Sequence, residues 1–278
     1  MKFRRALRRA LPPRLVRWLD RARLEAPVRL RDFPADLRER VRPGSPPVPP
    51  AWLRAHVGRT SSRDEYVRVG RAGFEEIVAA FAAHRDREEV YPRWLDFGCG
   101  CGRLCRHLPL PGTCESYVAM DVDGEAIRWN TRHLPRGEFV LISESPPTPL
   151  ASGSFDVVYC VSVFTHLDEA AQFSWLEELA RLLRPGGLLL ASTHSERLVV
   201  TRPDLSREQL ARLGSDGFAF APGAGSFNDH TTFHSRSYLE RHWGRSLTLL
   251  GFLPDGLFHL QDLSVWKRQE ADLVNNPG

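Results

Sequence analysis

The chain has 278 residues, of which 42% are hydrophobic, and a formal net charge of +4. It is long enough for one large α/β domain with additions. No run of 18 apolar residues occurs, so we expect no membrane-spanning helix. The first residues are rich in arginine but lack the apolar stretch of a secretory signal, and the five cysteines do not resemble a disulfide framework. We therefore expect a cytoplasmic protein.

The charge is unevenly distributed. Residues 1–42 hold 14 basic and 5 acidic side chains, whereas the remaining residues hold 24 basic and 29 acidic ones. The sequence therefore predicts a basic arm joined to a mildly acidic body. An acidic body disfavours a groove for DNA on its surface, because nucleic acids bind to basic surfaces.

The arm has the pattern of an amphipathic helix. Phe3, Leu7 and Leu11 recur at helical spacing, and arginines occupy the other face. Such a helix could lie on an anionic membrane surface, dock on its own domain or a partner, or remain a solvated tail. Residues 43–50, with five prolines, predict an extended linker, which places the domain at residues 51–278.

Within this domain, apolar strands alternate with amphipathic helices. This rhythm predicts a doubly wound, mostly parallel sheet with helices on both faces. Residues 198–236 interrupt it with a segment rich in Gly, Ser and Pro, which we expect to form a lid over the substrate. Strands are predicted at residues 94–97, 117–120, 139–142, 155–163, 188–191, 247–252 and 262–267, and helices at residues 64–84, 124–133, 168–183 and 237–244.

The strongest motif is the segment 96–103, Asp-Phe-Gly-Cys-Gly-Cys-Gly-Arg, between a predicted strand and a predicted helix. Glycines at alternate positions let the backbone turn tightly and approach a ligand. A dinucleotide loop would carry a third glycine where Arg103 stands. The spacing therefore favours a smaller ligand without phosphates.

A second motif supports a nucleoside ligand. The next predicted strand ends at Asp121, 19 residues after Gly102, where a carboxylate accepts hydrogen bonds from both hydroxyls of a ribose. Asp123 is expected to cap the helix that follows.

Together these motifs resemble the class I S-adenosylmethionine (SAM) dependent methyltransferases. The resemblance covers residues 94–194, including Phe155–Tyr159 in the fourth strand and Leu183–Leu188 at the turn into the fifth. It implies a Rossmann-like sheet of seven strands whose last strand, near residues 262–267, runs antiparallel. It also implies that SAM binds to a set of residues at the strand ends, namely Asp96, Gly98, Cys99, Gly100, Asp121, Val122, Glu144, Ser145 and Val161.

A narrower resemblance concerns the acceptor. The segments 162–167, 183–187, 192–194 and 261–263 are similar to methyltransferases associated with cell-envelope polysaccharide pathways. This resemblance implies a small-molecule or glycan-linked acceptor, methylated at a hydroxyl oxygen. A hydroxyl acceptor needs a general base, for which histidine is the commonest choice.

Three histidines are candidates for this base. His166 and His194 follow the fourth and fifth strands, where open α/β sheets bind their ligands. His234 lies in the segment expected to close over the acceptor. A packing role is the alternative for each of them. The cysteines near the glycine loop do not have the spacing of a structural zinc site, so no metal is expected.

Other functions remain open at this point. The Asn/Asp-Pro-Pro-Tyr/Phe motif of amide and base methylation is absent after the fourth strand, where Cys160–Phe164 stands instead. An RNA or protein methyltransferase that grips its substrate with the basic arm is one alternative. A SAM-binding subunit without catalysis is another.

Overall fold

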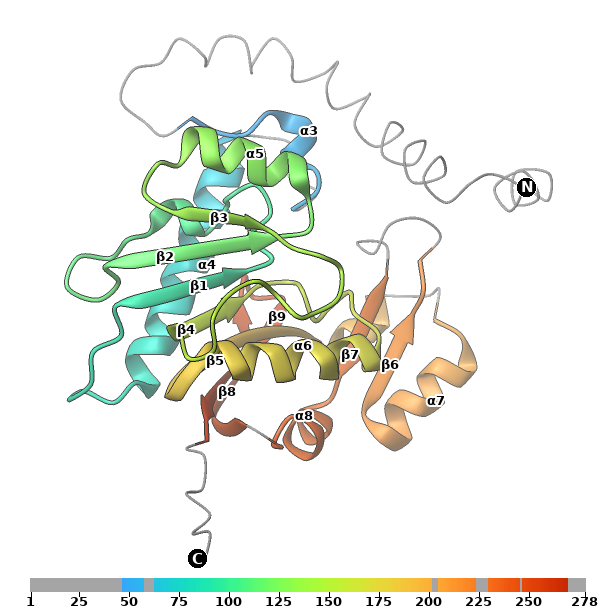
Figure 1. Cartoon of the computed structure of the whole chain (residues 1–278). Helices are drawn as coiled ribbons and strands as arrows, with labels where there is room; N and C mark the ends of the chain where they lie inside the picture. Colours follow the sequence, from blue (N-terminus) through green and yellow to red (C-terminus); the bar gives the residue numbers. More distant parts are fainter. Residues whose placement is uncertain (1–46, 58–62, 202–204, 224–229, 246, 270–278) are drawn as a thin grey trace, which may run out of the picture.

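A computed structural model describes residues 47–57, 63–201, 205–223, 230–245 and 247–269. Its centre is a sheet whose first five strands run parallel and whose carboxyl ends meet at one edge (Figure 1). In their order across the sheet these strands are β3 (Glu138–Leu141), β2 (Ser116–Asp121), β1 (Arg93–Phe97), β4 (Phe155–Cys160) and β5 (Leu183–Ser195). The first strand thus lies in the middle of the sheet. The chain adds β2 and β3 on one side of β1 and then returns to add β4 and β5 on the other side, as in doubly wound folds.

Two further strands complete the far side of the sheet, and only the one that pairs with β5 runs opposite to the first five strands. β9 (Gln261–Arg268) pairs with β5 in antiparallel register, from Leu188 opposite Lys267 to Thr193 opposite Asp262. β8 (Leu247–Leu257) pairs in turn with β9. The antiparallel strand predicted near residues 262–267 is therefore confirmed, although β8 lies outside it.

The segment 198–236 adds strands that the sequence did not predict. A short 3-10 helix, η2 (Glu196–Thr201), and a helix, α7 (Arg207–Asp216), lead into the hairpin of β6 (Phe218–Ala221) and β7 (Thr231–His234). β7 pairs with the last two residues of β5, so the sheet has nine strands among the described residues instead of the predicted seven. The hairpin forms because each strand turns one side toward a small apolar cluster with Leu205 and Leu213.

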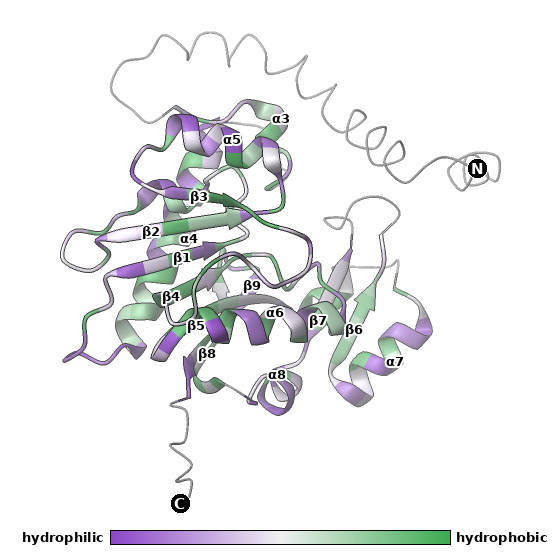
Figure 2. Cartoon of the chain, in the orientation of Figure 1, coloured by the Kyte–Doolittle hydropathy of each residue, from purple (hydrophilic) through white to green (hydrophobic). Residues whose placement is uncertain are grey.

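Helices cover both faces of the sheet. α4 (Arg63–His84) and α5 (Gly124–His133) pack on one face, and α6 (Glu169–Leu182) and α8 (Arg236–His242) on the other. Asp123 caps α5 by accepting hydrogen bonds from two backbone N–H groups, as predicted, and Asp168 caps α6. Figure 2 shows hydrophilic residues on the outer turns of α6 and α7. No helix in the described part of the chain is long and apolar enough to cross a membrane.

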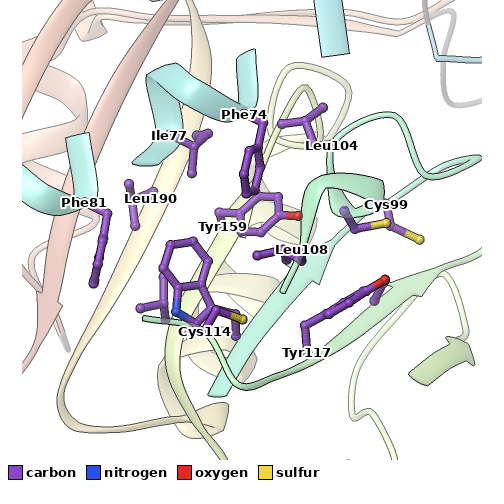
Figure 3. Close-up of a cluster of buried hydrophobic side chains, with 14 of the residues drawn as sticks. Phe74, Ile77, Phe81, Cys99, Leu104, Leu108, Cys114, Tyr117, Tyr159 and Leu190 are labelled. Atoms are coloured by element: carbon purple, nitrogen blue, oxygen red, sulfur yellow. The ribbon is translucent and has the colours of Figure 1, made fainter. Parts of the chain in front are cut away.

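The cluster beneath α4 shows why the strands have few polar residues. Phe74, Ile77 and Phe81 from α4 face Tyr159 and Leu190 from the sheet (Figure 3). These side chains are at most 5% exposed. Because both faces are buried in this way, parallel strands appear in the sequence as continuous apolar runs.

The expected helix after the glycine loop is much shorter than predicted. Only a 3-10 turn, η1 (Cys105–His107), follows the loop before the chain reaches Pro109 and Pro111. Proline has no N–H to donate and its ring clashes with the preceding turn, so the helix ends there. The strand predicted at residues 155–163 also ends early, at Cys160, because Ser162 takes a left-handed conformation with φ 61°.

The end of the proline-rich segment is attached to the domain. Pro49 is buried and its carbonyl accepts a hydrogen bond from Arg54, 2.5 Å away, while the carbonyl of Pro47 accepts one from Arg106, 2.8 Å away. The short helix α3 (Ala51–Arg54) follows directly. The predicted basic arm at residues 1–42 and the first part of the linker lie outside the described residues.

Candidate cofactor and acceptor site

The glycine loop at the end of β1 depends on left-handed backbone angles. Gly98, Gly100 and Gly102 have φ values of 77°, 51° and 79°. The N–H groups of Gly98 and Cys99 donate to the carbonyl of Met120 on β2, which holds the loop across the two strand ends. Side chains with a Cβ rarely adopt such angles, so the alternation of glycines follows from the turn itself.

Neighbouring segments approach this loop closely. A Cβ at Gly98 would lie 2.3 Å from Cγ2 of Val163, in the turn after β4. A Cβ at Gly100 would lie equally close to Cγ1 of Val57, which follows α3. The loop is therefore enclosed by the turn after β4 on one side and by the segment after α3 on the other.

Asp121 stands at the end of β2, as predicted, and is partly exposed. One carboxylate oxygen accepts a hydrogen bond of 2.7 Å from the N–H of Gly100, and the other accepts one of 2.8 Å from the N–H of Asp123. Burial raises the pKa of Asp121, although these backbone donors oppose the shift. Each oxygen keeps a second lone pair, so the carboxylate is able to accept further hydrogen bonds from a diol.

Asp123 connects this strand end to the segment after α3. His56 Nδ1 lies 3.2 Å from the Asp123 carboxylate. Burial opposes ionisation of Asp123, but His56 and the N–H groups of α5 outweigh it and lower its pKa to about 2. Motif reasoning did not find His56 or Val57, because they join the site only through contacts between segments distant in the sequence.

Asp96, the first residue of the motif, is buried inside the site. Its side chain is 3% exposed and faces Tyr159 and Cys105. Burial raises the pKa of Asp96 to about 7, and the nearby charge of Asp121 acts in the same direction. A buried carboxylate in this position is poised to bind a cationic group, whose charge would offset the cost of burial.

The cysteines of the loop point to different sides, as expected for alternate positions of a turn. Cys99 belongs to the cluster beneath α4, whereas Cys101 lies beside Tyr66 and Leu53 in a separate cluster. Burial raises the pKa of the Cys99 thiol, and that of the Cys101 thiol to about 12. In the described ranges, no group of three His, Cys, Asp or Glu side chains is arranged to hold a metal ion.

The other predicted cofactor residues lie at the same edge of the sheet. Glu144 and Ser145 are exposed after β3, while Val122 and Val161 are half-buried after β2 and β4. The structure therefore brings the whole predicted set to the carboxyl ends of neighbouring strands, where an open α/β sheet binds its ligand.

A polar network fixes the turn after β4. Ser162 N–H donates to the hydroxyl of Ser192 on β5, and this hydroxyl donates to Oε1 of Gln261 on β9. Gln261 Nε2 donates back to the hydroxyl of Ser162, 2.9 Å away. The network holds Ser162 in its left-handed conformation and thereby positions Val163 and His166, whose N–H donates to the carbonyl of Val163.

His166 and His194 lie near one another, with ring centroids 6.5 Å apart. His166 is half-buried, and its Nδ1 donates a hydrogen bond of 2.7 Å to the carbonyl of His230, just before β7. The hairpin that the insertion adds thus reaches the turn after β4. His194 lies at the end of β5, where its ring is 5.7 Å from that of Phe233.

His234 does not belong with these two histidines, which corrects its prediction as a base. Its side chain is 1% exposed, and Nε2 is 2.9 Å from Oε1 of Gln172 in the core. Burial, with a smaller effect of the nearby His194, lowers the pKa of His234 to about 3. A ring so enclosed does not reach an acceptor, because every residue of β7 is buried and the His234 ring bonds a side chain of the core.

Comparison with known proteins identifies the domain. Residues 95–191, which contain the glycine loop, Asp121 and the strands up to β5, match the family model described as a methyltransferase domain. This stretch of the chain is similar to a methyltransferase domain. The fold class, the methyltransferase assignment and the SAM cofactor predicted from the sequence are confirmed for this domain.

Solved structures of SAM-dependent methyltransferases share this fold. The enzyme from Clostridium acetobutylicum matches with a TM-score of 0.55 and 14% identity over 78% of this chain and 98% of its own. One from Methanosarcina mazei matches with a TM-score of 0.52 and 17% identity over 70% of this chain and 98% of its own. At these identities the likeness concerns the fold alone.

Two curated relatives are named O-methyltransferases. A malonyl-[acyl-carrier protein] O-methyltransferase of Enterobacter lignolyticus is 30% identical over 53% of this chain and 55% of its own. A ubiquinone biosynthesis O-methyltransferase of a Bradyrhizobium strain is 31% identical over 36% of this chain and 39% of its own. The chain spans about half or less of the curated relatives it matches. The predicted link with cell-envelope polysaccharides gains no support from these two names.

Proposed function

We propose that the protein transfers the methyl group of SAM to a hydroxyl oxygen of a small-molecule or glycan-linked acceptor. The names of both curated relatives specify oxygen as the methylated atom. The observation that carries the proposal is the hydrogen bond between His166 Nδ1 and the His230 carbonyl, because it prepares a base beside the glycine loop.

The residues at the strand ends fit SAM. We assign the ribose hydroxyls to Asp121, whose carboxylate is partly exposed and already anchored by two backbone donors. Asp96 is assigned to the amino group of the methionine moiety, because it is a buried carboxylate without an ion pair among the described residues. When bound, SAM supplies a methyl group activated by the positive sulfur. The protein therefore has to align the acceptor, exclude water and take up a proton.

His166 is the candidate for taking up this proton. A carbonyl oxygen only accepts hydrogen bonds, so in the neutral ring the proton resides on Nδ1 and the lone pair on Nε2. The second nitrogen is thereby set to accept the proton of a hydroxyl. Val163, which touches the glycine loop, is one turn away from His166. This contact supports a base beside the loop that we assign to the cofactor.

We further propose that the hairpin β6–β7 borders the acceptor. It contributes the His230 carbonyl that orients His166, and its Thr232 N–H and hydroxyl donate to the carbonyls of Thr165 and Leu167. A segment joined so tightly to the turn after β4 limits the size and orientation of an acceptor that reaches His166.

The reaction class is tested with matched small acceptors that carry a hydroxyl, an amine or a thiol on the same carbon skeleton. Formation of S-adenosylhomocysteine (SAH) is measured with purified protein and SAM, with titration calorimetry of SAH as the binding control. We expect SAH binding and turnover that is fastest with the hydroxyl series. Binding of SAH with faster turnover of amines or thiols would show that oxygen is not the preferred atom.

The role of His166 is tested by single-turnover methylation with the His166→Ala variant. Loss of a general base lowers the rate by about 10²–10⁴-fold and leaves SAH affinity unchanged. His133 is a matched control, because its Nδ1 also bonds a backbone carbonyl, that of Trp129, but it lies at the end of α5. If His166→Ala slows transfer no more than His133→Ala does, the proton acceptor is a different group, with His194 the next candidate.

A further inference from the structure

Arg103 is the first residue after the glycine loop, and its surroundings fix its position. Its backbone carbonyl lies against α4, where a Cβ at Gly70 would be only 2.4 Å from the Arg103 oxygen. Its guanidinium lies over the ring of Phe258, 5.0 Å from the centroid. Phe258 follows β8 and is itself held by a hydrogen bond from its N–H to Glu76 on α4. Two segments distant in the sequence therefore hold this side chain.

The guanidinium has no acceptor within the described ranges. Its Nε is buried without a hydrogen-bond partner, and its two other nitrogens donate no hydrogen bond to a described residue. Burial also lowers the pKa of Arg103. Other arginines of the domain differ: Arg181 bonds Glu178, and Arg184 bonds both Asp156 and Glu89. Because a buried N–H of a cation without an acceptor costs stability, this half-buried arginine is typical of a site for an anion.

The buried carboxylate of Asp96 lies at the other end of the loop. The charge of Arg103 acts on Asp96, and that of Asp96 on Arg103, yet the two side chains form no ion pair within 4 Å. The site thus offers one buried negative group and one half-buried positive group that do not neutralise each other. An α-amino acid in its zwitterionic form carries the complementary pair of charges on one carbon atom.

We propose that Arg103 binds the α-carboxylate of the methionine moiety of SAM, opposite the amino group that faces Asp96. The planar guanidinium matches a carboxylate through two parallel N–H donors. The inference rests on the proposed function, because it concerns the same cofactor. Arg103 thereby selects cofactors with an intact amino-acid end and anchors the sulfur above the glycine loop.

An anionic group of the acceptor is the other conceivable ligand of Arg103. The geometry favours the cofactor, because α4 and the turn after β8 hold Arg103 beside Asp96, whereas the hairpin β6–β7 holds His166. The cofactor analogues in the test below carry no acceptor, so they separate the two ligands.

The test compares three ligands by titration calorimetry: SAH, decarboxylated SAM and 5′-methylthioadenosine, which lacks the amino-acid end. They are titrated into the full chain and its Arg103→Met and Arg103→Lys variants. We expect Arg103→Met to weaken SAH binding by roughly 10- to 100-fold, the range for hydrogen bonds to a charged group, and to leave the other two ligands within about threefold. Arg103→Lys keeps the charge but loses the planar pair of donors, so an intermediate loss is expected.

Arg106→Met is the matched control, because Arg106 lies three residues further on and already bonds the carbonyl of Pro47. It should leave the ratio of SAH to 5′-methylthioadenosine affinity unchanged. Thermal unfolding without ligand gives a second readout. Removing a half-buried charge whose Nε has no acceptor leaves the melting temperature of Arg103→Met equal to or above that of the wild type, whereas loss of an arginine needed for packing would lower it.

The inference is overturned if Arg103→Met weakens all three ligands equally, or weakens none of them. Equal weakening with a lower melting temperature identifies a packing role. Absence of SAH binding in the wild-type chain contradicts the proposed function instead, and that result is obtained before any variant is compared.

Discussion

Val57 packs directly on Gly100: a Cβ at Gly100 would lie 2.3 Å from Cγ1 of Val57. Val57, in the segment that follows α3, thus covers the middle of the glycine loop, where the backbone has φ 51°. Gly100 is required for two separable reasons, its backbone conformation and the space that Val57 occupies.

The Gly100→Ala variant tests this relationship. Left-handed strain costs about 1–2 kcal/mol, and overpacking against Val57 adds about 1–3 kcal/mol to the loss of unfolding free energy. Gly112→Ala is the control, because Gly112 has φ 74° and nothing within 4 Å of a Cβ, so it reports strain alone. In a Val57→Ala background, Gly100→Ala should cost no more unfolding free energy than Gly112→Ala does, as measured by urea unfolding. An undiminished cost in this background would show that Val57 is not the obstacle.

The ribose assignment predicts that Asp121→Asn weakens SAH binding by at least about tenfold, because charge-assisted hydrogen bonds contribute roughly 1.5–3 kcal/mol each. Asp123→Asn is the neighbouring control. Asparagine is an equally good cap for α5, so this variant loses only the charge beside His56, which should cost at most about 1 kcal/mol of stability and change SAH affinity by less than about threefold. Wild-type affinity in Asp121→Asn, measured by calorimetry, would contradict the assignment.

Burial of His234 predicts a specific dependence of stability on pH. Burial lowers its pKa to about 3, so between pH 3 and 6.5 the unfolded chain binds a proton that the folded chain does not. Unfolding free energy should therefore decrease as the pH falls below 6.5, by up to about 1.4 kcal/mol per pH unit. Asp96, with its pKa raised to about 7, acts in the opposite direction over part of this range.

Comparison with His234→Gln isolates this contribution. Glutamine does not titrate, so the difference in unfolding free energy between wild type and variant should shrink and then reverse as the pH falls from 7 to 4. A difference that stays constant over this range would show that His234 is protonated in the folded protein.

Asp156 predicts a loss of stability without a loss of binding. Its buried carboxylate, 3% exposed, bonds Arg93 and Arg184 at the amino ends of the strands, the edge opposite to the glycine loop. Asp156→Asn should lower the unfolding free energy by roughly 1–3 kcal/mol, because it removes the charge that the half-buried Arg184 and the exposed Arg93 share, while Arg184 keeps Glu89. Asp216→Asn, at an exposed pair with Arg212, should cost at most about 1 kcal/mol. A tenfold drop in SAH affinity for Asp156→Asn would show that the two edges are coupled.

Local patterns in the sequence were enough to predict the first five strands, β8, β9 and the cofactor loop, but not the hairpin β6–β7. The central parallel strands are buried on both faces and so appear as apolar runs, and the predicted cap at Asp123 and the helix start predicted at residue 168 agree with the structure within one residue. The glycines of the loop are equally local, because their left-handed angles depend on the turn and not on distant residues.

Only the tertiary structure decided what surrounds that loop. Val57 and His56 reach Gly100 and Asp123 across more than 40 and 60 residues of chain, and no sequence period encodes such contacts. His166 and His234 look alike as candidates in the sequence, yet one lies at the strand ends and the other in the core. The burial of β7 depends on how the hairpin packs against α6 and α8, so long-range packing, rather than the local pattern, separated the two histidines.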